Sequence, residues 1–147
     1  MIIQKAIDSD SEVLKQLFSI LYKPELKWTK EKISKKIKSK EKEYYLVLDK
    51  KEVLGAFGIK FEDFEAKFGP LAVKPEFQKN KIGSKLLRFA EELTKEKGLK
   101  KIWCHSLEIY NAENFYKKNG WKEEEFIKNF WDGQNCFVFS KIIDRKS

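Results

Sequence analysis

The segment Leu71–Leu87, LAVKPEFQKNKIGSKLL, combines residue types that bind a negatively charged group. An apolar strand is followed by a short polar turn, and a helix is predicted to begin at about Ile82. The first backbone N–H groups of a helix lack intrahelical partners, and the helix dipole makes that end positive. Lys79, Lys81 and Gly83 would lie at this end, where phosphate groups bind. The pattern is neither GxGxxG nor a Walker loop, so the segment alone predicts only an anion site.

The length and composition of the chain indicate what kind of protein carries this site. With 147 residues, of which 41% are hydrophobic and 14% aromatic, we expect a single domain over residues 1–147. No apolar run approaches the roughly 20 residues of a membrane-spanning helix, so no membrane partner is expected. The first ten residues lack the basic start and apolar core of a signal peptide, which predicts a cytoplasmic protein.

The net charge of +8 leaves three interpretations open: nucleic-acid binding, an anionic cofactor, or a lysine-rich solvated surface. The scattering of 31 basic residues among 23 acidic ones favours the solvated surface. Cys104 and Cys136 lie in apolar, strand-like surroundings and have no metal-ligand spacing with His105, the only histidine. We therefore expect buried structural thiols and no metal.

Hydrophobic periodicity predicts an α/β chain with a mixed sheet. The expected helices run from a Ser9/Glu12 capping box to Tyr22, from a Thr29 cap to Ser39, and over Ile82–Lys97 and Ala112–Lys118. The expected strands are Ile2–Ala6, Tyr44–Leu48, Val53–Phe61, Lys67–Val73, Lys101–Ser106, Glu124–Phe130 and Gln134–Ile142. The strands Tyr44–Leu48, Val53–Phe61 and Lys67–Val73 are joined by short turns and should be antiparallel neighbours. The strands before and after the long helix should be parallel. Asp132-Gly133 is a strong turn signal for the last hairpin.

Two motifs resemble those of the GCN5-related N-acetyltransferase (GNAT) family. The stretch Val73–Leu87 is similar to the family's acetyl-CoA loop, V-x-P-x-[YF]-[RQ]-G-x-G-x-G-x-x-L-L. The stretch Ala112–Trp121, AENFYKKNGW, is similar to its ending A-x-x-[FL]-Y-x-K-x-G-[FW]. The order of predicted elements agrees with the family's acyl-CoA N-acyltransferase fold over essentially the whole chain. The resemblance implies an N-acetyltransferase that moves acetyl from acetyl-CoA directly to a primary amine of a small molecule or a protein, without a metal.

The resemblance also assigns a place for the coenzyme. The pantetheine arm would bind the backbone of Leu71, Ala72 and Val73, and an amide N–H near Leu71 could polarise the thioester carbonyl. The pyrophosphate would rest on the backbone of Gln78, Lys79, Asn80, Lys81, Ile82, Gly83 and Ser84. Asn111 and Asn114 would contact the coenzyme or cap the short helix.

Lys79 and Lys81 stand where the family commonly has glycine, and a side chain at positive φ costs about 1 kcal/mol or more. Our hypothesis is that both lysines keep ordinary backbone angles and that one ammonium group pairs with a phosphate. The alternative is that both point to water.

Tyr116 is the expected general acid, because a positioned phenol can protonate the thiolate that leaves the thioester. The alternative is an aromatic helix residue packed with Phe115 and Trp121. The base that deprotonates the amine is open between Glu65, His105, the turn carboxylates Glu62 and Asp63, and a water chain.

The acceptor pocket is expected to be lined by aromatic side chains in loops, namely Tyr22, Trp28 and Trp131. Trp28 and Trp131 could instead only close the end of the sheet. Two other functions stay open: a catalytically silent coenzyme A-binding module, against which the retained Tyr116 argues, and a basic nucleic-acid-binding domain. The second is disfavoured because the chain has no recognition-helix pattern, so no nucleic-acid partner is expected. Whether the protein forms a homodimer is left open.

Overall fold

The computed structural model describes residues 1–143, without the side chains of Pro24, Glu25 and Asn80. The chain forms two compact units. Unit 1 comprises Met1–Lys60 and Pro70–Arg88, and unit 2 comprises Phe61–Gly69 and the chain from Phe89 onward. A single domain over residues 1–147 stays a prediction, and its last four residues lie outside the described part of the chain.

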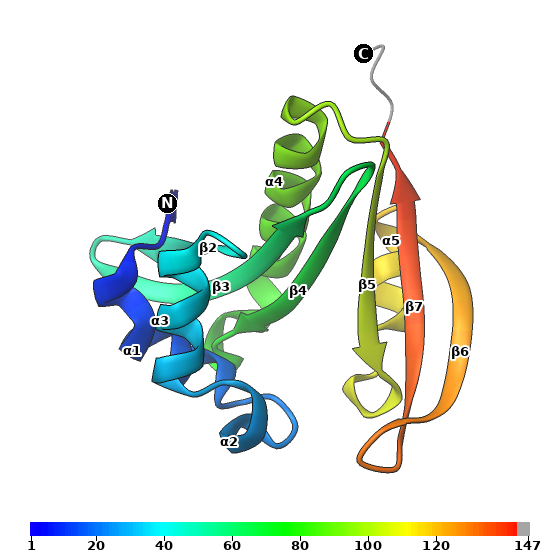
Figure 1. Cartoon of the computed structure of the whole chain (residues 1–147), viewed down its shortest axis with the longest axis horizontal. Helices are drawn as coiled ribbons and strands as arrows, with labels where there is room; N and C mark the ends of the chain where they lie inside the picture. Colours follow the sequence, from blue (N-terminus) through cyan, green and yellow to red (C-terminus); the bar gives the residue numbers. More distant parts are fainter. Residues whose placement is uncertain (144–147) are drawn as a thin grey trace. The chain divides into compact units, whose positions relative to one another are not determined.

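The elements form a mixed α/β fold, as the sequence predicts, with strand order β1-β2-β3-β4-β5-β7-β6 (Figure 1). The strands are β1 (Ile2–Lys5), β2 (Glu43–Asp49), β3 (Glu52–Phe61), β4 (Glu65–Val73), β5 (Lys101–Leu107), β6 (Lys122–Trp131) and β7 (Gln134–Ile142). The helices are α1 (Ser11–Phe18), α2 (Pro24–Lys27), α3 (Lys30–Ser39), α4 (Ile82–Glu96) and α5 (Glu113–Lys118).

The start and end of the first helix differ from the prediction. The Asp10 carboxylate accepts a hydrogen bond from the Ile7 N–H at 2.8 Å, which closes a 3-10 turn over Asp8–Asp10 before α1 begins. Asp10 rather than Ser9 is therefore the N-cap residue, and the expected Ser9/Glu12 capping box is wrong. The helix ends at Phe18 rather than Tyr22, and the short α2 follows it.

Unit 1 contains antiparallel strands, the helices α1, α2 and α3, and the first part of α4. β1 pairs with β2 from Ile2 opposite Leu48, and β2 pairs with β3 through a tight turn at Lys50 and Lys51. α1 and α3 contact each other (Figure 1). Thr29 caps α3 by accepting a hydrogen bond from the Lys32 N–H at 3.2 Å, as predicted. The core of this unit contains Ala6, Leu14, Leu17, Phe18, Ile33, Tyr44, Leu46, Ala56 and Ala72.

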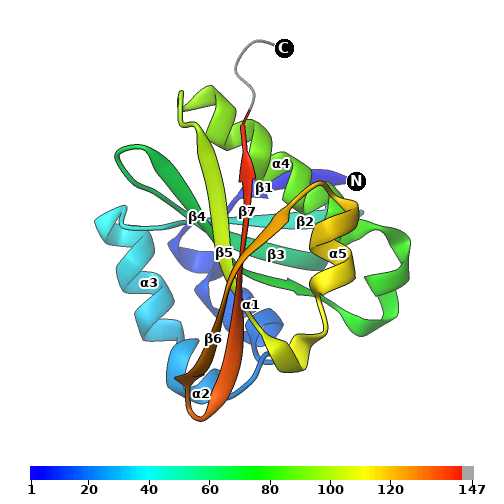
Figure 2. The ribbon, with the colours of Figure 1, turned by 90° about the vertical axis from the view of Figure 1, so that its right-hand side faces the viewer.

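Unit 2 contains the beginning of β4 together with β5, β7 and β6, and Figure 2 shows α5 on one side of these last three strands. β4 and β5 are parallel, which confirms the predicted connection through the long helix. β5 pairs with β7 and β7 with β6 in antiparallel fashion. The β6–β7 turn has positive φ at Asp132 (51°) and Gly133 (73°), as the sequence predicts.

The β4–β5 ladder of unit 2 is short. Paired positions run from Glu65 opposite Lys101 to Phe68 opposite Cys104. The next residue of β4, Gly69, has φ of +120°, a conformation that side-chain-bearing residues rarely adopt. The ladder thus ends at a glycine break within β4, directly beside Cys104 in register.

Candidate functional site

The end of β4 in unit 1 is held tightly against β3. The Lys74 N–H donates to the Leu54 carbonyl at 2.9 Å, and a Cβ built at Gly55 would lie 2.8 Å from the Ala72 carbonyl oxygen. Real Cβ atoms do not approach so closely, so Gly55 is what allows this contact. Ala72 and Val73 are buried and Leu71 is half-buried, which fixes the backbone that was expected to bind pantetheine.

The segment Lys74–Ser84, here called the 74–84 turn, connects β4 to α4. Pro75–Asn80 forms 3-10 turns, with the Phe77 N–H donating to the Lys74 carbonyl at 2.9 Å. The Gln78 side-chain amide donates to the Val73 carbonyl at 3.0 Å. Gln78 therefore ties the turn to the end of β4 through its side chain, whereas the prediction used only its backbone.

Lys81 corrects one expectation about this turn. Its backbone is left-handed, with φ of 60° and ψ of 21°, so the hypothesis that both lysines keep ordinary angles is wrong for Lys81. The chain has to reverse between the 3-10 turns and α4, and the helix begins with the Lys85 N–H donating to the Lys81 carbonyl at 3.1 Å. A lysine thus adopts here a left-handed conformation that glycine would adopt without steric cost. Lys79 keeps ordinary angles, as expected.

The charges around this helix start suit an anion. The first turn of α4 carries no acidic residue, and both Lys79 and Lys81 are exposed. The N–H groups of Ile82 and Gly83 precede the first backbone bond of the helix and lie at the positive end of its dipole. This part of the chain fits the phosphates of a coenzyme by its backbone and its charge.

Tyr116 lies in unit 2 within a set of packed side chains that we call the Tyr116 cluster: Tyr116, Cys104, Trp121 and Phe139, which are buried, and the half-buried Phe115. Its side chain belongs to α5 and the residue is only 5% exposed. The Tyr116 ring stacks on Phe139, with centroids 4.8 Å apart, and contacts the rings of Phe115 at 5.0 Å and Trp121 at 5.3 Å. The packing that was the alternative interpretation is therefore present, and it also holds the phenol in one orientation.

A hydrogen bond joins the Tyr116 hydroxyl and the Cys104 thiol. Burial raises the pKa of Tyr116 well above its ordinary value, and the neighbouring Cys104 raises it further. Burial also raises the pKa of Cys104 to about 12, although hydrogen bonds from Tyr116 and the Phe139 backbone oppose that effect. Both groups therefore stay protonated at neutral pH, and the phenol lies beside a sulfur atom.

The prediction missed Cys104 and Gly69 as parts of this arrangement. Cys104 is the last β5 residue paired with β4, and Gly69 breaks β4 immediately after its partner Phe68. A signal for the break was present, because the Gly69-Pro70 pair inside an apolar strand indicates a bulge. The Tyr116–Cys104 contact depends on tertiary packing and has no local signal. Cys104 and Cys136 are both buried and unbridged, as expected.

The other coenzyme candidates, Asn111 and Asn114, lie around the start of α5. Asn111 has φ of 51° and its N–H donates to the Glu108 carbonyl at 3.1 Å, which closes the 3-10 turn after β5. The N-cap position of α5 is Ala112 and has no side-chain hydrogen bond, so neither asparagine caps this helix. A role for them in coenzyme binding stays a prediction.

Two of the candidate bases, Glu65 on β4 and His105 on β5, lie on the face of the paired β4 and β5 strands opposite to Cys104. Residues alternate along a strand, so His105 faces away from the Tyr116 cluster, and so does Glu65, which is opposite Lys101 in register. The His105 ring is 5.0 Å from that of Trp103 and 4.5 Å from that of Phe130. His105 is half-buried in this aromatic strip, which the prediction did not include.

The acceptor candidates are divided between the two units. In unit 1, the Trp28 ring is 5.4 Å from that of Phe18 at the core, with the Lys42 ammonium 5.7 Å from its centroid. Trp28 therefore packs on the core of unit 1, in agreement with the alternative interpretation. Tyr22 is half-buried in the same unit, and Trp131 is half-buried at the end of β6 in unit 2. Their roles in acceptor binding stay predictions.

Residues 1–143 lack the features of two other classes of site. In this part of the chain, no three His, Cys, Asp or Glu side chains gather to hold a metal ion. In the same range, no helix is long and apolar enough to cross a membrane.

Comparison with known proteins agrees with the resemblance of the two motifs. The model of the acetyltransferase (GNAT) domain matches residues 40–123. A protein of Bacillus subtilis (strain 168), provisionally named ribosomal protein bS18-alanine N-acetyltransferase, is 31% identical over 124 residues, which are 80% of each chain.

Solved structures share the fold at low sequence identity. The ribosomal-protein-S18-alanine N-acetyltransferase from Escherichia coli is 14% identical with a TM-score of 0.84, covering 99% of this chain and 96% of its own. An aminoglycoside 6′-N-acetyltransferase complexed with coenzyme A is 16% identical with a TM-score of 0.83, covering 100% of this chain and 99% of its own.

Proposed function

This chain belongs to the GNAT acetyltransferase family, and on that premise we propose how it transfers acetyl from acetyl-CoA and which amine receives it. The 74–84 turn holds the phosphates of the coenzyme. Tyr116 acts as the general acid. The acceptor is the α-amine at the N-terminus of a protein or peptide, and the transfer uses no metal.

Coenzyme binding is supported by the fit of the 74–84 turn to an anion. The Ile82 and Gly83 N–H groups, the helix dipole and the exposed Lys81 all favour a pyrophosphate. The backbone of Leu71, Ala72 and Val73 would hold the pantetheine arm. The Val73 carbonyl already accepts the Gln78 amide, so the arm would use the other backbone groups of this stretch or the second lone pair of Val73.

The observation that carries the mechanism is the buried Tyr116 phenol, which is stacked on Phe139 and hydrogen-bonded to a sulfur atom. Bound acetyl-CoA supplies a thioester, whose C–S bond breaks as the C–N bond to the amine forms. Tyr116 then exchanges its hydrogen bond with the Cys104 thiol for one with the leaving sulfur, to which it gives its proton. The amine loses one proton, which a water chain leading to Glu65 or His105 would accept.

The proposed acceptor follows from the relative and from amine chemistry. The 31% identical relative carries the name of an alanine N-acetyltransferase acting on a ribosomal protein. An α-amine has a pKa of about 7.7–8.0, against about 10.4 for a lysine side chain. A larger fraction of it is neutral near pH 7, so attack makes a smaller demand on the base.

The acceptor is tested with matched amines and mass spectrometry of the products. One peptide carries a free α-amine and no lysine, a second is blocked at its N-terminus and contains one lysine, and an aminoglycoside is the third acceptor. We expect acetylation of the first peptide at a rate at least about tenfold above the others. Preferred acetylation of the aminoglycoside or the lysine would overturn the proposed acceptor.

The role of Tyr116 is tested by Tyr116→Phe, which removes one oxygen and keeps the ring packing. We expect kcat to fall about 100-fold while acetyl-CoA affinity, measured by isothermal titration, stays the same. Turnover at the wild-type rate would remove Tyr116 from the mechanism. If the wild-type protein did not bind acetyl-CoA in this titration, the assignment of the 74–84 turn would be contradicted instead.

A further inference from the structure

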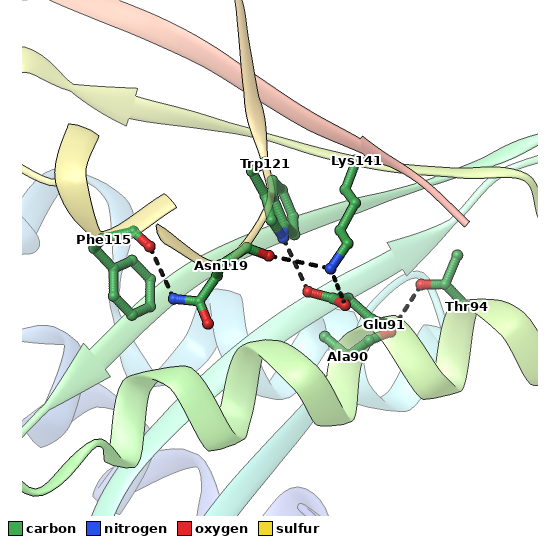
Figure 3. A network of polar contacts seen from close by, with 7 residues as sticks. All are labelled: Ala90, Glu91, Thr94, Phe115, Asn119, Trp121 and Lys141. Atoms are coloured by element: carbon green, nitrogen blue, oxygen red, sulfur yellow. Dashed lines mark hydrogen bonds and ion pairs between the residues drawn. The ribbon is translucent and has the colours of Figure 1, made fainter. Parts of the chain in front are cut away.

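A polar network lies in unit 2 beside the Tyr116 cluster and has no part in the chemistry proposed above (Figure 3). We call it the Glu91 clamp; it consists of Glu91, Lys141, Trp121 and Asn119. Glu91 belongs to α4, and its two carboxylate oxygens have separate partners. Oε1 pairs with the Lys141 ammonium at 2.9 Å, and Oε2 accepts the Trp121 indole N–H at 2.9 Å. Lys141 also donates to the Asn119 carbonyl at 3.1 Å.

The Glu91 clamp contacts the C-terminal end of α5. Asn119 is the C-cap residue of this helix, and its side-chain amide donates to the Phe115 carbonyl at 2.8 Å. The Tyr116 carbonyl accepts from the backbone N–H groups of Asn119 at 3.1 Å and Trp121 at 3.0 Å. The residue that holds the phenol is thus hydrogen-bonded to two residues that Glu91 and Lys141 hold in place.

Gly120 makes room for this arrangement. It has φ of +86°, and a Cβ built there would lie 3.4 Å from the Lys141 ammonium nitrogen. The Asn119-Gly120 ending of the second motif therefore lets the chain turn and brings the lysine against the helix end. A cation at this position also complements the carbonyl end of the helix.

α5 needs such external support. It has six residues, too few for a helix to be stable alone, and its N-cap position lacks a side-chain hydrogen bond. The Glu91 side chain is 15% exposed and that of Lys141 is 32% exposed, so the pair is largely shielded from water. A shielded pair whose polar atoms are all engaged specifies one position for the groups it contacts.

We propose that Glu91 is a positioning residue for acetyl transfer: through Lys141, Asn119 and Trp121 it fixes the end of α5 and thereby the position of the Tyr116 hydroxyl. This inference rests on the proposed role of Tyr116 as general acid. A small displacement of that hydroxyl would weaken proton transfer to the leaving sulfur, because such transfer depends on hydrogen-bond geometry.

The test uses Glu91→Gln and Lys141→Met, which remove the charge pair and keep similar side-chain volumes. We expect each to lower kcat about tenfold, with the KM for acetyl-CoA within about twofold of the wild type. Lys141→Arg should retain most of the activity because it keeps a cation at this position. The matched control is Glu123→Gln, which removes an exposed ion pair of 3.9 Å with Lys117, also on α5. That control should keep the wild-type kcat.

The decisive measurement repeats Glu91→Gln in a Tyr116→Phe background. If Glu91 acts through the phenol, the double variant has the kcat of Tyr116→Phe alone, within about twofold. A merely structural role lowers kcat by the same factor in both backgrounds and overturns the proposal. Thermal unfolding of each variant identifies any that fail to fold; Lys141→Met then takes the place of Glu91→Gln in the cycle.

The two proposals fail in different ways. A wild-type kcat in Tyr116→Phe would overturn the general-acid role and this inference with it. A slow Tyr116→Phe together with a wild-type kcat in Glu91→Gln and Lys141→Met would overturn this inference alone.

Discussion

The 74–84 turn and the Tyr116 cluster are built on opposite principles. The turn acts through its backbone: its hydrogen bonds are mostly main-chain, and the lysines at 79 and 81 are exposed. The Tyr116 cluster acts through its side chains, which are buried and in ring contact. A region of the first kind tolerates a new side chain wherever the backbone angles are kept, whereas a region of the second kind does not.

The two regions also differ in how far water reaches their ionisable groups. In the Tyr116 cluster, burial raises the pKa values of Tyr116 and Cys104, so both are neutral and their proton positions are fixed. In the 74–84 turn the cations are solvated, and they act on an anion together with the helix dipole. In the proposed mechanism, the 74–84 turn binds the coenzyme by backbone geometry and charge, and the Tyr116 cluster controls one proton.

The largest expected effect comes from displacing the backbone that leads into the 74–84 turn. A Cβ at Gly55 would lie 2.8 Å from the Ala72 carbonyl oxygen and 3.3 Å from Val73 Cα, so Gly55→Ala has to push the end of β4 away from β3. We expect the free energy of unfolding to fall by about 1–3 kcal/mol and acetyl-CoA to bind several-fold more weakly. Urea unfolding and isothermal titration measure the two quantities.

The control for this variant is Gly133→Ala in the β6–β7 turn, where the new Cβ would have open space but φ is +73°. It should cost about 1 kcal/mol of stability through backbone strain and leave acetyl-CoA affinity unchanged. If Gly55→Ala were destabilised without a loss of affinity, the end of β4 would not be part of the coenzyme site.

Much of the fold could be predicted because local patterns specified it. The α4 start at Ile82, the Thr29 cap and the Asp132-Gly133 turn each follow from a few neighbouring residues. The first helix was less predictable, because the Asp10 carboxylate bonds to Ile7 and a 3-10 turn takes the place of the expected Ser9 cap.

The candidate site divides in the same way. The sequence indicates the 74–84 turn and Tyr116, since both lie within continuous motifs. It does not indicate that the Cys104 thiol lies beside the Tyr116 hydroxyl, because these residues lie on different elements and meet only through packing. The left-handed angles of Lys81 were also unpredictable, since lysine disfavours them and only the geometry of the turn requires them.

A smaller effect is expected from the raised pKa of Cys104. An acid with a pKa near 9 when unfolded and about 12 when folded stabilises the protein fully below pH 9, and this stabilisation is lost as the pH rises from 9 towards 12. The loss from Cys104 alone is about 1 kcal/mol at pH 10. Urea unfolding at pH 8 and pH 10 should show a decrease that is smaller by about this amount in Cys104→Ala. An equal decrease in both proteins would mean that the thiol ionises in the folded Tyr116 cluster as easily as in water.

The smallest effect separates the side chain of Lys81 from its backbone. Its angles, φ 60° and ψ 21°, are nearly those of Lys40, the C-cap residue of α3, at φ 62° and ψ 19°. Lys81→Gly and Lys40→Gly should therefore both relieve left-handed strain and raise the free energy of unfolding by up to about 1 kcal/mol. Urea unfolding measures the two changes against the wild type.

Only one of the two variants should change coenzyme binding. If the Lys81 ammonium pairs with a phosphate, Lys81→Gly binds acetyl-CoA several-fold more weakly and with a smaller salt dependence, whereas Lys40→Gly binds like the wild type. Isothermal titration at two salt concentrations distinguishes these outcomes. Unchanged affinity in Lys81→Gly would contradict the pairing and leave the backbone of the 74–84 turn, with its helix dipole, as the part that binds the phosphates. The contrast with the Tyr116 cluster, where one side-chain oxygen is expected to control turnover, would then be at its sharpest.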